Sequence, residues 1–326
     1  MDKKSIFYIT FGPTGSGKGY LEAIYTGKIR SMHNDILYNK KNEPFLAHID
    51  NYIEQDREYI LGMKDIILGN QSVFTKILDI NESNINNPNI DNIGEILDNI
   101  TNLYFNIRKK YNSQLDNEIL LNLKNRKDII FETTGVKNYN WIFDTYNDLL
   151  KNYIIILVYP FVDNNLLKMR ILDRFKRQYI NFMNLIDNNM VNGELDNKQF
   201  EQSIEYMISS KQSAPRLPNI FDNSLVNNIN EIQNTLSYYI SQCKINDKYN
   251  NEIMIYDNNS NSKLILYVSC KNEIIHDEIN QILEKYKTSI NDNLKTSINN
   301  LKNGVEGGSE FLYKLYKKYY RENLNF

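Results

Sequence analysis

The chain has 326 residues, which is long enough for one large domain or two ordinary ones with a sizeable hydrophobic core. Its formal net charge is −2 and charges of both signs are spread along it, so we expect neither a nucleic-acid partner nor an anionic membrane surface. No run approaches the ~20 apolar residues of a membrane span. With 2 cysteines and 3 histidines we expect a reduced, cytoplasmic protein without a structural zinc site. The over-use of Asn, Ile, Lys and Tyr is typical of AT-rich genomes such as those of large DNA viruses, for which the expected place is the host cytoplasm or the virion.

Short apolar runs alternate with segments of helical periodicity along most of the chain. The runs predicted to be strands are 5–11, 45–49, 128–131, 153–159, 252–256 and 264–269. The segments predicted to be helices are 17–30, 52–68, 93–125, 139–150, 164–187, 197–211 and 227–242. This alternation predicts an α/β fold, with a parallel sheet of about five strands flanked by helices.

The sheet and its helices are expected to form one domain over residues 1–270. Within it, an Asn-rich polar segment and the long helix that follows make 81–125 a helical insertion. From residue 271 the pattern is helical only, which predicts a C-terminal helical tail over 271–326. The aromatic and basic helix Ser309–Phe326 could dock a protein partner, a lipid or nucleic acid, or pack on its own domain.

A glycine-rich segment, GPTGSGKG, lies between the first predicted strand and the first predicted helix. Its spacing matches the phosphate-binding pattern G-x-x-x-x-G-K, in which backbone N–H groups surround phosphate oxygens and the lysine neutralises the β- and γ-phosphates. The strand before it and the helix after it are the context that this motif requires. The residues predicted to bind a nucleotide are Gly12, Pro13, Thr14, Gly15, Ser16, Gly17, Lys18, Gly19 and Tyr20.

Gly19 stands where such loops usually carry a Ser or Thr whose hydroxyl binds Mg²⁺. The absence of this hydroxyl could mean that the chain binds a nucleotide without catalysing a reaction. Adenylate kinases, however, also have Gly directly after the loop lysine and remain active, although their next residue is Thr and here it is Tyr20. We therefore expect Mg²⁺ to depend on the phosphates, on water and on carboxylates elsewhere.

Two carboxylates follow predicted strands, Asp50 after FLAHI and Glu132 after DIIF. In an open parallel sheet the crevice beyond the carboxyl ends of the strands is where ligands bind. Either acid could hold Mg²⁺ through water or accept a proton from an attacking hydroxyl. Asp50 could instead begin the next helix, and Thr134 could bind a substrate hydroxyl or cap a helix.

Arg170, Arg174 and Arg177 lie at i, i+4 and i+7 on the helix after the most apolar strand, which places them on one face. Three guanidinium groups on one face suit a polyphosphate, because their forked donors match phosphate oxygens. The alternative is a solvated basic face. Arg216, between Pro215 and Leu217, is a weaker candidate.

Together these segments resemble the zeta-toxin-like branch of P-loop kinases. The matching pieces are GPTGSGKG, HIDN, IIFETTG, VYPFVDNNLLKMRILDRFKR and IMIYDNN, in the expected order over about residues 5–260. The resemblance implies a P-loop kinase-like domain that transfers a phosphoryl group from ATP or GTP, with Mg²⁺, to a hydroxyl of a nucleotide sugar or another small molecule. It also implies a lid helix carrying arginines, here Arg170 and Arg174, and acceptor contacts from Glu132 and Thr134.

The chain departs from this family at the second strand. The family shows two acids spaced D-x-D, the second of which is usually the base, whereas here Asp50 is followed by Asn51 and Tyr52. Asp50, or Glu54 one turn later, would have to serve in its place.

The sequence therefore predicts an ATP- or GTP-dependent small-molecule kinase in which Lys18, Asp50, Arg170 and Arg174 are catalytic. Two alternatives stay open: a nucleotide-binding or structural module without catalysis, and a polynucleotide 5′-kinase. The second shares the loop, the acid and the arginines, but the sequence offers no concentrated basic groove for a strand.

Overall fold

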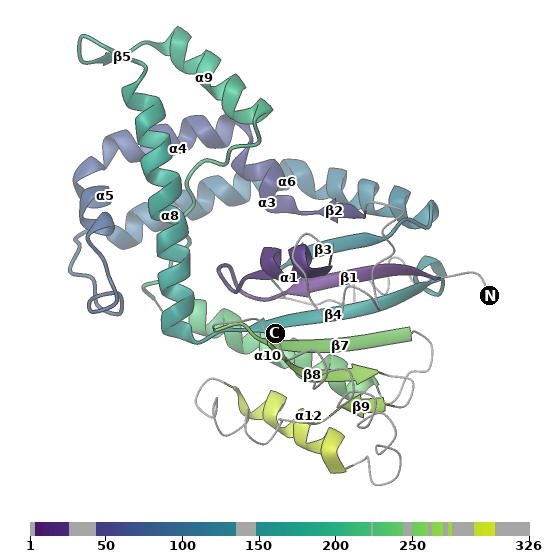
Figure 1. The fold of residues 1–326 in the computed structure, drawn as a ribbon. Helices are drawn as coiled ribbons and strands as arrows, with labels where there is room; N and C mark the ends of the chain where they lie inside the picture. Colours follow the sequence, from purple (N-terminus) through teal and green to yellow (C-terminus); the bar gives the residue numbers. More distant parts are fainter. Residues whose placement is uncertain are drawn as a thin grey trace, which may run out of the picture. The chain divides into compact units, whose positions relative to one another are not determined.

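The computed structural model describes residues 4–25, 44–134, 148–222, 224–243, 250–259, 263–269, 273–275 and 290–303 (Figure 1). Its internal contacts divide the chain into two compact units. The first unit comprises residues 1–47, 119–163 and 227–326, and the second comprises 48–118 and 164–226. The expected domain boundary at residue 270 adjoins residues outside the described part and stays a prediction.

The first unit contains a seven-stranded sheet in the order β2-β3-β1-β4-β7-β8-β9. Its strands are β1 (Ser5–Phe11), β2 (Phe45–Ala47), β3 (Ile129–Thr133), β4 (Tyr153–Phe161), β7 (Asn250–Asp257), β8 (Lys263–Ser269) and β9 (Glu273–Ile275). The five strands from β2 to β7 are parallel, which confirms the predicted α/β fold. β8 and β9 continue the sheet as antiparallel strands, and β9 lies where only helix was expected because three residues are too few to show a strand period.

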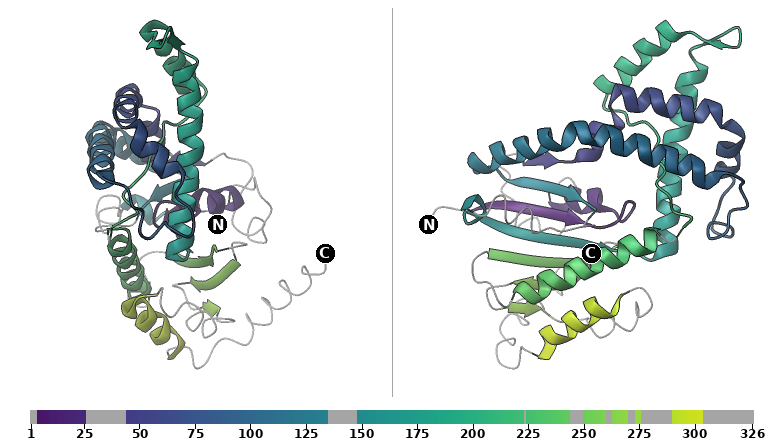
Figure 2. Two further views of the ribbon diagram at one scale, coloured as in Figure 1. Left: turned by 90° about the vertical axis from the view of Figure 1, so that its left-hand side faces the viewer. Right: turned by 180° about the vertical axis from the view of Figure 1, so that it is seen from behind.

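The central strands β1 and β4 are mostly apolar and are buried at all but one position each, because both faces of the sheet are covered. On one face Tyr8 and Val158 pack with Leu21 of α1 (Lys18–Tyr25). On the other, Tyr159 hydrogen-bonds with Gln233 of α10 (Ser224–Cys243). Figure 2 shows α1 and α10 on opposite sides of the sheet. The glycine loop is therefore attached to a strand of which six of the seven residues are buried.

The C-terminal helical segment is represented by α12 (Asp292–Asn303), which packs beside α10. Ser237 of α10 donates a hydrogen bond to the Asn293 carbonyl at 2.9 Å. The aromatic and basic helix predicted over 309–326 lies outside the described residues. Among the helices that the structure does describe, none is long and apolar enough to cross a membrane.

The second unit is helical. Its helices are α3 (Ile49–Glu54), α4 (Arg57–Gly69), α5 (Gln71–Leu78), most of α6 (Ile93–Lys124), α8 (Asn164–Asp187) and α9 (Asn197–Ser209). A hairpin of β5 (Met190–Val191) and β6 (Glu194–Leu195) joins α8 to α9. α8 has the predicted bounds. The helix predicted over 52–68 is instead divided into α3 and α4, because Asp56 is extended and its carboxylate caps α4 by accepting from the Glu58 and Tyr59 amides.

Leu21 tests the packing of α1 on the sheet. Its side chain is 1% exposed, so Leu21→Ala should lower the free energy of unfolding by about 2–5 kcal/mol through lost burial and a residual cavity. Leu121→Ala is the matched control, because that helical leucine is 59% exposed and should change stability by less than about 0.5 kcal/mol. Urea unfolding measures both, and equal effects would contradict this packing.

Candidate functional site

The glycine loop, defined here as Gly12–Gly19, turns the backbone inward directly after β1. Gly15 and Gly17 have φ angles of 81° and 88°, in the left-handed region that glycine adopts without strain. A Cβ at Gly17 would also lie 2.1 Å from the Asn258 side-chain nitrogen, so no larger residue fits there. Left-handed residues alternating with ordinary ones make a concave array of N–H groups that suits an anion.

Lys18 begins α1, and its side chain folds back over the loop. Its ammonium donates to the carbonyls of Gly12 at 2.8 Å and Pro13 at 3.0 Å. The same nitrogen lies 3.4 Å from a carboxylate oxygen of Glu132, and the lysine is 6% exposed. These three partners hold the charge at one place beside the loop backbone.

Ser16 adds an unused donor to the loop. The residue is fully buried, and its hydroxyl has no hydrogen-bond partner in the described part of the chain. A Cβ added at Gly12 would lie 2.9 Å from that hydroxyl, so the glycine at residue 12 leaves space around the Ser16 hydroxyl. A buried hydroxyl without a partner costs about 1–3 kcal/mol, and a phosphate oxygen is an acceptor that would remove this cost.

Asn258, which sequence reasoning did not single out, braces the loop from the sheet. It follows β7, is 5% exposed, and its side-chain nitrogen donates to the Ser16 carbonyl at 2.6 Å. Its own backbone N–H donates to the Phe161 carbonyl at the end of β4. The available signal was its place directly after a parallel strand, where polar residues meet at the carboxyl edge of the sheet.

Glu132 lies within β3 rather than after it, paired in register with Thr10. Its side chain faces Lys18, and the neighbouring Thr133 carbonyl accepts a hydrogen bond from the Gly12 amide at 3.3 Å. Thr134 is exposed. The structure therefore joins Glu132 to the glycine loop, while the acceptor contacts expected of Glu132 and Thr134 stay predictions.

Gly19 and Tyr20 are exposed on the first turn of α1. A Cβ at Gly19 would meet nothing within 4 Å. Packing therefore leaves room for the serine or threonine that such loops usually carry.

In the second unit, Asp50 belongs to a partly buried charge cluster, which we define as Asp50, Glu54, Tyr104, Arg174 and Arg216. Asp50 lies in the first turn of α3, where one oxygen accepts from the Tyr104 hydroxyl at 2.5 Å. Its other oxygen is 2.6 Å from an Arg216 nitrogen. The Arg216 guanidinium also stacks over the Tyr104 ring at 3.8 Å. Asp50 is thus engaged through both oxygens.

Glu54 forms the second half of the cluster. It accepts from Arg174 at 2.6 Å and lies 3.7 Å from Arg216. Burial raises the pKa of the Glu54 carboxyl above its usual value, although the two arginines act in the opposite direction. The cluster balances two acids against two cations, which allows it to be buried.

Tyr52 lies at the position where the motif resemblance implied a base. Its hydroxyl donates to Glu118 of α6 at 2.6 Å. Burial raises the pKa of Tyr52 to about 12, and the Glu118 hydrogen bond and charge raise it further in the same direction. The phenol is therefore protonated at neutral pH and cannot serve there as a general base.

The predicted site residues thus form two groups, one in each unit. The loop residues and Glu132 come together in the first unit. Asp50 and Arg174 share a cluster in the second, with half-buried Arg170 one turn before Arg174 on α8. Sequence reasoning missed Tyr104 altogether and ranked Arg216 low, because neither lies near Asp50 along the chain.

Comparison with known proteins adds no relative: no protein-family model matches the chain, and no curated protein matches it. The resemblance to zeta-toxin-like kinases rests on the motifs themselves.

The brace on the loop can be tested by removing it with Asn258→Ala. Hydrogen exchange of the Gly12–Tyr20 amides should quicken by roughly 2- to 13-fold, because one net hydrogen bond contributes about 0.5–1.5 kcal/mol. Asn259→Ala is the control, since that side chain bonds to Asp257 and to the Asp163 amide instead. Unchanged loop exchange in the first variant would show that Asn258 is no brace.

The charge cluster predicts a large and pH-dependent effect of Arg216→Met. Losing the arginine leaves Asp50 without its cation and Glu54 with Arg174 alone, and should cost about 3–5 kcal/mol at neutral pH. The unpaired acids then have raised pKa values when folded, so the deficit should shrink as the pH falls from about 8 to about 5. Arg57→Met, which removes exposed pairs with Glu201 and Glu205, should cost no more than about 1 kcal/mol. A deficit equal to that of this control, or independent of pH, would contradict the cluster.

Proposed function

We propose that this chain is a phosphotransferase that uses a nucleoside triphosphate, ATP or GTP, to phosphorylate a hydroxyl of a small molecule. The observation that carries the proposal is the Lys18 ammonium, held by the Gly12 and Pro13 carbonyls beside a loop with two left-handed glycines. Such a lysine and an inward-turned backbone suit the phosphates of a nucleotide better than any other common ligand.

The loop residues fit a phosphate chain in charge and in donors. Lys18 supplies a positive charge, the Ser16 hydroxyl supplies a buried donor, and α1 begins with its positive end at the loop. In the described residues no group of three or more His, Cys, Asp or Glu could hold a metal ion. Mg²⁺ would therefore be held mainly by phosphate oxygens and water, with Glu132 as the nearest carboxylate to Lys18.

A bound nucleoside triphosphate would supply the phosphoryl group, whose bond to the β-phosphate oxygen breaks as a bond to the acceptor oxygen forms. In this proposal the loop amides and Lys18 hold and neutralise the phosphates, and Glu132 positions Lys18. Asp50, three residues beyond the end of β2, takes the acceptor proton, and Arg170 and Arg174 stabilise the transferred group. The roles of these three residues are proposed from their places in the sequence.

One observation favours a second candidate, a nucleotide-binding module without catalysis. Asp50 and Glu54 are both occupied, by Tyr104 and Arg216 in one case and by Arg174 in the other. An acceptor hydroxyl would have to share a carboxylate oxygen with these partners or displace one of them. Nucleotide binding would survive in such a protein, while transfer would not.

Nucleotide titration tests the shared part of both candidates. ATP and GTP, with and without Mg²⁺, are titrated calorimetrically into the full chain. Lys18→Ala should weaken binding at least ~10-fold, because it removes charge-assisted hydrogen bonds to phosphate. Lys4→Ala is the control, because that exposed lysine at the start of the same sheet only contacts the Lys151 carbonyl. Failure of the wild type to bind either nucleotide would overturn both candidates.

Transfer of label from γ-labelled nucleotide to nucleosides, nucleotide sugars, simple sugars and oligonucleotides separates the candidates. Label on a small acceptor, lost in Lys18→Ala, would support the kinase. Tight binding without transfer to any acceptor would leave the non-catalytic module. Label on oligonucleotides alone would identify the polynucleotide 5′-kinase.

A further inference from the structure

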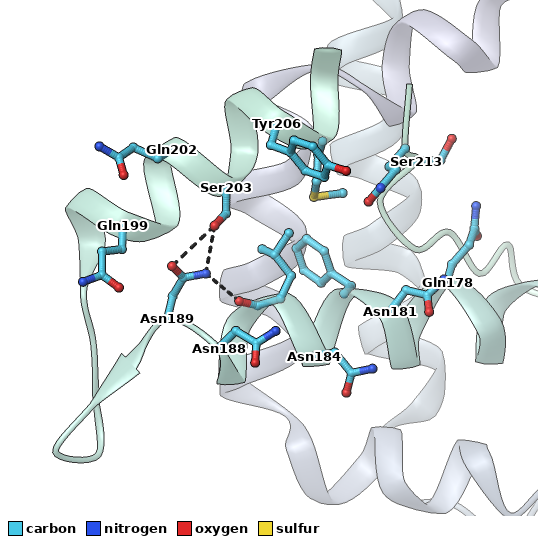
Figure 3. A pocket seen from close by; sticks show the side chains of 14 residues that line it. Gln178, Asn181, Asn184, Asn188, Asn189, Gln199, Gln202, Ser203, Tyr206 and Ser213 are labelled. Atoms are coloured by element: carbon cyan, nitrogen blue, oxygen red, sulfur yellow. Dashed lines mark hydrogen bonds between the residues drawn. The ribbon is translucent and has the colours of Figure 1, made fainter. Parts of the chain in front are cut away.

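The second unit contains a cavity of about 1120 Å³ between the end of α8 and the facing helix α9, with the β5–β6 hairpin joining the two helices (Figure 3). Fourteen residues line it, and none of them carries a formal charge. Eight of the fourteen are Asn or Gln. We name this cavity the amide groove. It lies wholly within one unit and is separate in the chain from the glycine loop.

The amides are arranged in two stripes, one on each helix. Asn181, Asn184 and Asn188 follow one another at spacings of three and four along α8, which places them on one face. Gln199 and Gln202, with the same spacing, belong to α9. Both sets of amides line the same pocket. Figure 3 shows Asn184 and Asn188 on α8 and Gln199 and Gln202 on α9 around it.

Most of these amides have no partner of their own. One amide, Asn189, is fixed: it donates to the Leu185 carbonyl at 2.7 Å and to the Ser203 hydroxyl at 3.0 Å. By contrast, the five amides of the two stripes make no side-chain hydrogen bond within the described residues. The Gln178 side-chain oxygen is buried and also lacks a partner there. Each free amide offers two donors and one acceptor to a ligand.

The lining also contains flat apolar surface. Tyr206 is 64% exposed and projects from α9, whereas the lining residues Phe182 and Met207 are 2% and 3% exposed and offer little surface. An exposed aromatic ring beside many amides suits a ligand with polar edges and apolar faces. A sugar ring has this character, because its hydroxyls point outward from the edge and its C–H groups lie on the faces.

We propose that the amide groove binds a neutral oligosaccharide. Side-chain amides can donate to one hydroxyl and accept from its neighbour, so a row of them matches the vicinal hydroxyls of successive sugar rings. The absence of charge from the lining disfavours phosphates, nucleotides and anionic glycans. A peptide would need pockets for apolar side chains, whereas Phe182 and Met207 are packed beneath the surface. The proposal is independent of the glycine loop.

The test titrates the full chain with maltohexaose, cellohexaose and chitohexaose while the side-chain amide signals of Asn and Gln are followed by NMR. At least one sugar should shift the signals of Asn181 and Asn188. The double variant Asn181→Ala/Asn188→Ala should bind that sugar at least ~10-fold more weakly, because each lost amide removes one or two hydrogen bonds. The matched control is Asn99→Ala/Asn102→Ala, two exposed helical residues of the same unit outside the groove, which should leave the affinity unchanged.

Three results would overturn the proposal. The first is no binding of any of the three sugars up to about 10 mM, a range that includes weak carbohydrate affinities. The second is sugar binding that the groove variant does not weaken. The third is binding of a mixture of uncharged peptides at Asn181 and Asn188 in place of the sugars, which would assign the groove to peptide recognition. Circular dichroism of the groove variant confirms that its helices are intact.

Discussion

The hydrogen bond from Asn258 to the Ser16 carbonyl is the contact on which the loop conformation depends. It joins the ends of β1 and β7, two strands apart in the sheet, and occupies the space that any side chain at residue 17 would fill. Three carbonyl oxygens of the loop accept hydrogen bonds from the protein itself. The Ser16 oxygen accepts from Asn258, and the Gly12 and Pro13 oxygens accept from Lys18. The Gly12 and Ser16 amides donate to the Thr133 and Pro13 carbonyls. The other N–H groups of the loop are what an anion can bind.

The second unit is constrained by a different interaction, the pairing of two acids with two arginines in a partly buried cluster. Arg216 comes from a segment between α9 and α10, yet it reaches Asp50, Glu54 and the face of Tyr104. Removing Arg216 would take the cation from Asp50 and leave Glu54 with Arg174 alone, so the cluster favours one placement of the segment after α9 against α3 and α6. The negative charge that would allow Asp50 to act as a base therefore also pairs it with Arg216, which gives Asp50 a structural role.

The sequence predicted features that depend on neighbouring residues better than contacts between residues far apart along the chain. The bounds of α8 and the presence of a parallel sheet of about five strands were predicted correctly, because long periodic or uniformly apolar segments carry their own signal. The break between α3 and α4 was not predicted. The capping by the Asp56 carboxylate involves a single turn, whereas the apolar period continues across it without interruption. The partners of the loop and of Asp50 were beyond prediction. Asn258 is 242 residues from Ser16, and Tyr104 is 54 residues from Asp50.

The fold explains one of the two departures from the expected kinase motifs, Tyr52, but not the other, Gly19. Gly17 is required by its left-handed backbone and by Asn258, whereas a side chain at residue 19 would meet open space. The missing hydroxyl is therefore no consequence of packing, and the fold would accept a serine or threonine there. Tyr52, by contrast, has a structural role, because its hydroxyl donates a hydrogen bond to Glu118 within the second unit. Whether this chain performs phosphoryl transfer thus depends less on the loop, whose geometry is intact without residue 19, than on whether Asp50 can exchange Tyr104 or Arg216 for a substrate hydroxyl.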